Sequence, residues 1–225
     1  MCFSTEASFG AGILLSAIGV ATLKKAKQPS EFFFASIPLI FAVQQFDEGF
    51  LWLALSHKSY AAIEVPTTYI FLIIAQIIWP IWVPFSIYKL ESSLKRKKII
   101  GIFLVMGCLV ALYNGVCFLN YQLKGNIVGQ HISYSQDYST IFTNYVGLFY
   151  VLATIFPPFF SSIKRMWALS TAIFISYVIT TIFYEEYFVS VWCFFASIIS
   201  ITVYAAMREI SKPFQAETEM QTSNS

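Results

Sequence analysis

Four polar side chains interrupt an otherwise apolar stretch, FAVQQFDEGFLWLAL, at residues 41–55: Gln44, Gln45, Asp47 and Glu48. A carboxylate in such a setting could bind a cation, take up a proton or act as a general base, and an amide could orient a ligand by hydrogen bonds. On a helix, Gln44 and Glu48 share a face because they are four residues apart, and Gln45 and Glu48, three apart, nearly share it. Asp47 lies about 100° round the helix from Glu48, so the two acids need not belong to one site.

A second set of residues could bind a metal ion. Cys2, His131 and Cys193 carry the thiol and imidazole groups that bind zinc or copper, and Glu48 could then act as a general base on metal-bound water. Their spacing matches no compact ligand motif. A Cys2–Cys193 disulfide in an oxidising exterior, or simple packing, fits the same residues. The cofactor is therefore unknown from the sequence, with zinc or copper as candidates.

The elements that hold these side chains follow from composition. Of 225 residues, 57% are hydrophobic, 18% aromatic and only 12% charged, and the mean hydropathy is +0.67. Soluble domains carry roughly 25% charged residues, and one of this size could not bury so much apolar surface. Lipid must solvate much of the chain, so the sequence predicts an integral membrane protein.

Seven stretches are apolar enough to cross a hydrocarbon core of about 30 Å, which needs roughly 20 residues per helix. The sequence therefore predicts an all-α bundle of seven transmembrane helices: Ser8–Leu23, Phe32–Leu55, Thr67–Leu90, Ile99–Leu119, Ser139–Ser161, Met166–Tyr184 and Phe188–Met207. They form one domain, residues 1–212, because most connecting loops are short. Residues 213–225 are polar and are expected to form a disordered cytoplasmic tail.

The basic residues predict the orientation. All of the 14 lysines and arginines except Lys58 and Lys124 follow the first, third, fifth and seventh predicted helices. Basic loops favour the cytoplasmic side, which puts the N-terminus outside and the C-terminus inside, in a multi-pass protein of the cell (inner) membrane. Topology explains these basic loops without nucleic acid, and the expected macromolecular environment is the lipid bilayer.

The only long loop, Asn120 to Tyr138, is expected on the outer side. Turn-forming residues at Lys124–Asn126 lie between segments rich in β-branched and aromatic residues. This pattern indicates a short hairpin or lid over the outer mouth of the bundle. An irregular solvated loop fits the pattern equally well.

Polar side chains from several predicted helices reach similar depths in the outer half of the bundle. Ionisable groups inside spans usually mark sites, so the pattern predicts an outward-opening polar pocket that binds or transports a small polar molecule or ion. An alternative, chiefly for Gln76 and Asn144, is that the amides only join helices by hydrogen bonds. The residues expected to bind the ligand are Gln44, Gln45, Glu48, Trp52, Gln76, Tyr113, Asn114, Asn144 and Trp192.

Two other functions stay open. One is a metal-dependent intramembrane enzyme, such as a hydrolase of a lipid-like substrate, with its site at the outer-face cysteines and histidine. The other is an assembly partner whose polar layer serves packing alone. No catalytic residue is assigned, and whether the protein is an enzyme is uncertain from the sequence. Retinal proteins are disfavoured, because the last predicted helix, Phe188–Met207, contains no lysine for a Schiff base.

Several motifs carry a resemblance that runs nearly from end to end: MCFSTEASF, PLIFAVQQFDEG, WPIWVP, GQHISY, the serine pair at 161–162 and SVWCFFAS. The chain resembles a family of small bacterial membrane proteins that open Met-Cys-Phe-Ser and form a domain of unknown function. The resemblance implies a seven-helix protein but no activity. Its pattern does not include the Asp47 position and does include Cys2, Gln44, Gln45, Glu48, His131 and Cys193.

Overall fold

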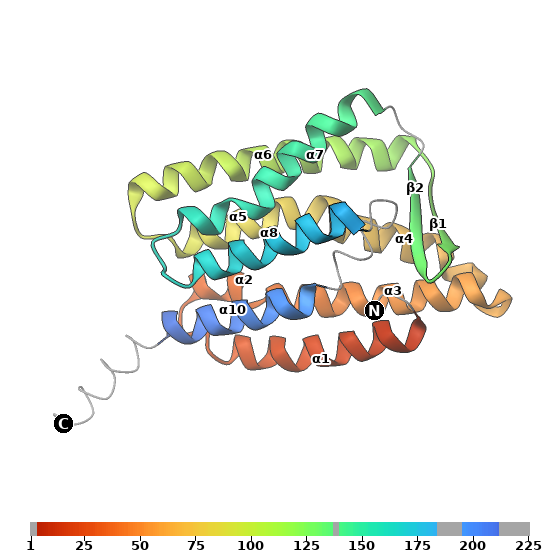
Figure 1. The fold of residues 1–225 in the computed structure, drawn as a ribbon, viewed down its shortest axis with the longest axis horizontal. Helices are drawn as coiled ribbons and strands as arrows, with labels where there is room; N and C mark the ends of the chain where they lie inside the picture. The colour runs from red at the N-terminus through yellow and green to blue at the C-terminus, as the bar shows by residue number, and fades with distance from the viewer. Residues whose placement is uncertain (1–3, 137–139, 184–194, 212–225) are drawn as a thin grey trace.

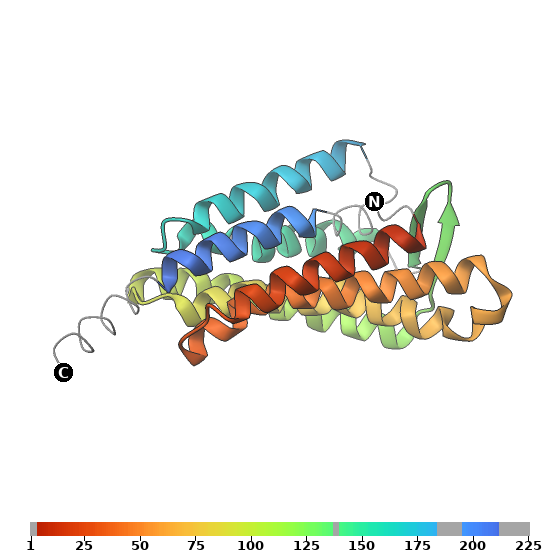
Figure 2. The ribbon, with the colours of Figure 1, turned by 90° about the horizontal axis from the view of Figure 1, so that it is seen from below.

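A computed structural model describes residues 4–136, 140–183 and 195–211. The chain is mostly helical, and the long helices run along one axis of the molecule (Figure 1). A small two-stranded sheet lies at one end of this bundle, and the same arrangement is seen from below (Figure 2).

Helix α1 (Thr5–Leu23) packs antiparallel against α3 (Ile37–Ser56). The Ser4 side chain caps α1 by accepting a hydrogen bond from the Ala7 amide at 3.2 Å. Small residues let the two helices approach closely, because a Cβ at Gly12 would meet the ring of Phe46 at 3.1 Å. Such contacts are a common means of joining helices in lipid.

The sequence predicted one continuous helix over Phe32–Leu55, and this prediction is wrong. The structure has two helices here, α2 (Pro29–Ala35) and α3, separated at Ser36. Pro38 explains the break, because proline supplies no amide hydrogen to the preceding turn. Trp82 braces the junction: its Nε1 donates to the Phe33 carbonyl at 3.0 Å and to Ser36 Oγ at 3.2 Å.

The predicted helix Thr67–Leu90 is longer and irregular. A 3₁₀ helix (Lys58–Ile63) leads into α4 (Glu64–Ile73), a π-helical segment (Ile74–Ile78) and α5 (Trp79–Leu90). After a short link, α6 (Leu94–Asn120) returns across the whole bundle and extends beyond the predicted Ile99–Leu119.

The long loop contains a hairpin, as one of the two interpretations predicts. Strand β1 (Leu123–Val128) pairs antiparallel with β2 (His131–Gln136). The turn was expected near Lys124–Asn126, but those residues lie within β1. The turn is instead at Gly129 and Gln130, where Gly129 has a φ of 64°. Glycine at the first central position of a two-residue loop is typical of a type II′ turn.

The last part of the described chain contains α7 (Thr140–Ile155), a 3₁₀ turn (Pro157–Phe160), α8 (Met166–Phe183) and α10 (Ala196–Ile210). Helix α7 ends earlier than the predicted Ser139–Ser161, because a residue before proline, here Phe156, disfavours helical continuation. The start of the predicted helix Phe188–Met207 and the predicted tail lie outside the described residues.

Four helical stretches of the described chain are long and apolar enough to cross a membrane: Thr5–Leu23, Lys58–Leu90, Leu94–Asn120 and Met166–Phe183. Helix α3 carries the four polar residues in its centre, and the described parts of α7 and α10 span only 16 and 15 residues. The four stretches indicate a membrane protein.

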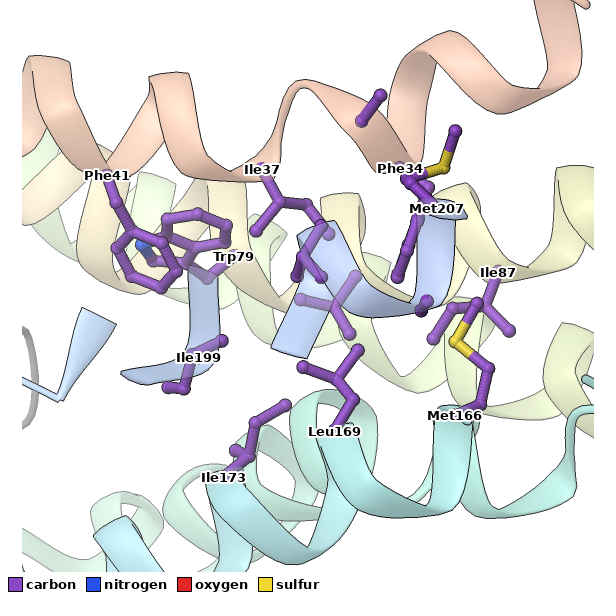
Figure 3. Packing of buried hydrophobic residues seen from close by; sticks show 14 of the residues in the cluster. Phe34, Ile37, Phe41, Trp79, Ile87, Met166, Leu169, Ile173, Ile199 and Met207 are labelled. Atoms are coloured by element: carbon purple, nitrogen blue, oxygen red, sulfur yellow. The ribbon is translucent and has the colours of Figure 1, made fainter. Parts of the chain in front are cut away.

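The main apolar core lies where α2, α3, α5, α8 and α10 meet (Figure 3). Ile87 of α5 and Met166 of α8 are both fully buried, and Met207 of α10 and Phe34 of α2 complete the contact. This core fixes the half of the bundle that lies away from the hairpin.

The two ends of the bundle differ in their connections. At one end, called here the hairpin end, lie the sheet and the 3₁₀ helix Lys58–Ile63. At the other, called the basic end, the α1–α2, α5–α6 and α7–α8 links come together (Figure 1). Glu91 ties two of these links: it accepts bonds from the Ser162 amide at 2.7 Å, the Ser162 hydroxyl at 2.8 Å and the Ser93 amide at 2.9 Å. Arg96 donates to the Ser161 carbonyl at 2.6 Å.

Candidate functional site

The turn of α3 that carries Gln44, Gln45, Asp47 and Glu48, called here the polar turn, is buried. Gln44 and Glu48 have no exposed surface, Gln45 is 1% exposed and Asp47 is 8% exposed. Buried polar groups are costly unless they find partners, so the contacts of these four side chains decide what the turn can do.

Two hydrogen bonds organise the amides. Gln45 Nε2 donates to Glu48 Oε2 at 3.1 Å, the contact expected for residues three apart on a helix. Trp79 Nε1, at the start of α5, donates to Gln44 Oε1 at 2.9 Å. The Trp79 ring also packs on Phe41, with centroids 4.0 Å apart. Since the indole can only donate, it fixes the Gln44 oxygen toward α5 and directs the amide nitrogen elsewhere.

Three buried polar atoms of α3 have no hydrogen-bond partner within the described parts of the chain. They are Gln44 Nε2, Asp47 Oδ2 and Trp52 Nε1. Asp47 lies against the backbone of Phe71 on α4, so it points toward a neighbouring helix. Two donors and one carboxylate oxygen left unsatisfied within nine residues are unusual, because native interiors satisfy nearly all such atoms.

The hairpin covers this end of α3. Ile132 of β2 is fully buried and packs against Leu51 and Trp52. Tyr134 stacks on Phe71 with ring centroids 4.8 Å apart and an interplanar angle of 5°. A Cβ added at Gly125 of β1 would meet Thr68 Oγ1 of α4 at 3.3 Å and Leu51 Cδ2 of α3 at 3.5 Å, so β1 packs against both helices. The sheet therefore forms a packed lid beside the polar turn.

His131 begins β2, next to the buried Ile132, and is itself half-buried. Burial lowers the pKa of the His131 imidazole, which favours its neutral form. The neutral form is the one that binds metal ions. His131 thus lies on the lid, at the same end of the bundle as Trp52.

One predicted ligand-binding residue, Asn114, and one residue that was not predicted, Tyr150, contact the π-helical segment Ile74–Ile78. Asn114 Nδ2 donates to the Gln76 carbonyl at 3.1 Å, and Tyr150 Oη donates to the Ala75 carbonyl at 2.6 Å. Pro80 accounts for both contacts: it has no amide hydrogen for Gln76 in an α-helical pattern or for Ala75 in a π-helical one. Neighbouring helices supply the missing donors, as expected in lipid.

The other predicted site residues are placed as follows. Tyr113 is half-buried and packs against the cluster around Phe71 and Cys117. Asn144 belongs to α7, but its side chain is outside what the structure describes, as are Cys2, Trp192 and Cys193. No group of three histidine, cysteine or acidic side chains suited to a metal ion occurs among the described residues. Cys2 and Cys193 lie outside those residues.

Sequence reasoning missed Trp79 and Tyr150 as partners of the polar layer. Nothing in their local spacing marks them, since Trp79 is 35 residues from Gln44 and Tyr150 is 75 from Ala75. Ser8 was also missed: it is fully buried on α1 and its Oγ has no partner in the described structure. The sequence signal for its burial was that Ser8 and Gly12, two small residues four apart, share one face of α1.

The fold and this turn define a helical membrane protein with a buried polar layer in one of its helices. The chain belongs to DUF6629, a family of unknown function, whose model matches residues 1–218. Neither the search of curated proteins nor that of solved structures returned a match.

Proposed function

We propose that the protein binds a small polar molecule or ion at the polar turn of α3, and that it is a receptor or transporter for this ligand. The observation that carries the proposal is a pair of buried donors that are unpartnered within the described residues, Gln44 Nε2 and Trp52 Nε1, on the helix face of the buried Glu48. Together they present two donors beside a carboxylate, and Asp47, which lies toward α4, adds a second buried acid next to this face. A ligand or ion that met these groups would remove the free-energy cost of leaving them unsatisfied.

The chemistry of the turn favours a cation or a ligand with a positively charged group. Adjacent acids at positions 47 and 48 are both buried, and two carboxylates brought out of water repel each other unless a cation or proton lies nearby. Gln45 holds one oxygen of Glu48. Trp79 holds Gln44. The turn is therefore preorganised for a ligand before the ligand arrives.

The proposal includes a topology. The three remaining helices, α3, α7 and α10, complete a bundle of seven transmembrane helices, with the hairpin end outside and the basic end in the cytoplasm. The distribution of lysines and arginines supports this orientation. A reporter enzyme that is active only outside, fused after Lys58, should be active, and one fused after Ser211 should not. The reverse pattern would invert the topology.

The test of binding uses purified protein and a panel of probes: sodium, potassium, magnesium, zinc and copper ions, and a pH series. A ligand at 100 times its Kd stabilises the folded state by about 2.7 kcal/mol. We expect at least one probe to raise the Tm of the wild type, with apparent affinity falling at least tenfold in Glu48→Gln. Glu64→Gln, at the start of α4 and outside the polar turn, is the matched control and should behave as wild type.

Equal shifts in the wild type and Glu48→Gln would exclude Glu48 as the contact. If no probe shifts the wild type, and a variant with Gln44, Gln45 and Glu48 made apolar is more stable and fully functional in cells, the polar layer serves packing and the proposal is wrong.

A second candidate is a metal-dependent membrane enzyme, with Cys2, His131 and Cys193 as ligands and Glu48 as general base. The position of His131 on the lid favours it, because the neighbouring Ile132 contacts Trp52 of the same helix as Glu48. In the sequence, Cys2 and Cys193 each stand three residues before a described helix, α1 and α10, and α1 begins near the hairpin end (Figure 1). Elemental analysis decides: this candidate requires stoichiometric zinc or copper that is lost in His131→Ala, and metal-free active protein contradicts it.

A further inference from the structure

A cavity of about 420 Å³ lies at the basic end, far from the polar turn of α3. It is formed by the last turns of α10 and the residue just before α8, two segments that lie side by side at that end of the bundle (Figures 1 and 2). Its lining residues are Arg165, Ile201, Tyr204, Ala205, Arg208 and Glu209.

The walls change from apolar to charged along α10. Ile201, Ala205 and Arg208 follow the i, i+4, i+7 spacing of one helix face. Ile201 is 57% exposed, as expected of a side chain that meets lipid. It lies about 10 Å from Arg208 along the helix, at about 1.5 Å per residue. One face of α10 thus offers an apolar track that ends at an arginine.

The charged mouth has two arginines and one acid. Arg165 Nε binds Glu209 Oε2 at 2.9 Å, and the two side chains are 58% and 35% exposed. A pair this exposed contributes little to stability, and a guanidinium with one N–H engaged has four more to donate. Arg208 is exposed beside it. The lining therefore has a net charge of +1, and Tyr204 adds a hydroxyl between the apolar and charged parts.

We propose that this cavity binds an anionic phospholipid. The headgroup phosphate accepts hydrogen bonds from Arg165, Arg208 and Tyr204, and an acyl chain runs along Ile201 and Ala205. Arginine forks match phosphate oxygens, and basic pockets between helices near the membrane surface suit anionic headgroups. The exposed Trp167, two residues after Arg165, is a side chain typical of the membrane–water interface. The inference does not depend on the function proposed for α3.

The test measures lipid binding to the purified full-length protein by native mass spectrometry, with phosphatidylglycerol, phosphatidylcholine and inorganic phosphate as probes. The wild type should retain phosphatidylglycerol and bind it at least tenfold more tightly than phosphatidylcholine. Arg165→Gln combined with Arg208→Gln should lower phosphatidylglycerol affinity at least tenfold. Lys95→Gln combined with Lys98→Gln removes the same charge from exposed positions near the start of α6 and should change it less than twofold.

A variant that fills the cavity separates shape from charge. Ala205→Trp keeps both arginines and should also lose phosphatidylglycerol binding. Equal losses in the two charge variants, or full binding by Ala205→Trp, would show that lipid is held by general attraction to the basic end and would overturn the proposal. Binding of inorganic phosphate as tight as that of phosphatidylglycerol would identify a soluble phosphoryl ligand and overturn the lipid assignment. Unfolding curves in detergent without lipid confirm that each variant is folded.

Discussion

At the scale of single residues, Gly107 is the most tightly packed glycine of α6. A Cβ there would collide with the carbonyl oxygen of Pro80 on α5. That carbonyl lacks its usual helical donor, because the residue four positions later is Pro84. Glycine lets α5 and α6 approach each other closely here, although it destabilises a helix by about 1 kcal/mol relative to alanine. The close approach explains why glycine stands at this position.

Gly107→Ala should therefore destabilise the protein by about 1–3 kcal/mol, the usual cost of overpacking. Gly115→Ala is the control on the same helix, since its Cβ would meet only Ile77 Cδ1 at 3.9 Å; it should be neutral or slightly stabilising. Thermal unfolding in one detergent measures both. Equal Tm values for the two variants would show that the contact with Pro80 does not restrict the fold.

Residue-level prediction succeeded where the helix period decides the outcome. The three-residue spacing of Gln45 and Glu48 is enough to anticipate that they meet, and they are hydrogen-bonded. The same spacing argument separates Asp47, which lies against Phe71 on another helix. The indole of Trp79 could not be anticipated, because a contact across 35 residues depends on how α3 and α5 pack. Whether these groups bind a ligand stays a prediction.

At the scale of elements, the hairpin is a lid whose turn depends on one glycine. Gly129 has a φ of 64°, and a β-branched residue would be strained there. Gly129→Val should loosen the hairpin and raise amide hydrogen exchange across β1 and β2, while Gln130→Ala should not. Because Ile132 covers Trp52, indole quenching by a soluble quencher should increase in the same variant. Unchanged exchange would mean that side-chain packing alone holds the lid.

The sequence predicted where the secondary-structure elements lie but not their interruptions. The length of the apolar stretches predicted each long helix, and a hairpin was one of two structures predicted for the long loop. The break at Ser36, the π-helical segment at Ile74–Ile78 and the early end of α7 all accompany prolines. A proline in the sequence predicts an irregularity but not whether the helix bends, breaks or widens there. That outcome depends on which neighbouring side chain donates to the carbonyls that proline leaves unbonded. The hairpin turn was misplaced because Lys124–Asn126 is as rich in turn formers as Gly129–Gln130.

At the scale of the whole molecule, Glu91 joins the two halves of the bundle at the basic end. Burial alone would raise the pKa of Glu91, but hydrogen bonds from Ser162 and Ser93 outweigh it and hold that pKa below its ordinary value. A carboxyl with a lowered pKa in the folded state contributes stability that is fully present above its unfolded pKa of about 4.3. This contribution is lost as pH falls through the folded value.

Glu91→Gln should therefore be less stable than the wild type at pH 7, and the difference should shrink as pH falls below about 4.3. Tm measured from pH 7 to pH 3 checks the trend. Glu209→Gln removes a half-buried carboxylate, 35% exposed, from the same end and should have a small effect at pH 7, because its partner Arg165 is largely exposed. A wild-type advantage over Glu91→Gln that grows toward low pH would contradict the assignment.

The pairing of α5 with α6 has a consequence for biosynthesis. Proline leaves carbonyls of the Lys58–Leu90 segment without donors, and Asn114 of α6 donates to one of them, the carbonyl of Gln76. Until α6 emerges from the ribosome, that carbonyl has no donor from α6 and would be costly in hydrocarbon. We expect the two helices to enter the membrane as a pair, so that the Lys58–Leu90 segment of a released chain truncated after Leu90 is accessible to added protease, and that of a chain truncated past Asn120 is protected.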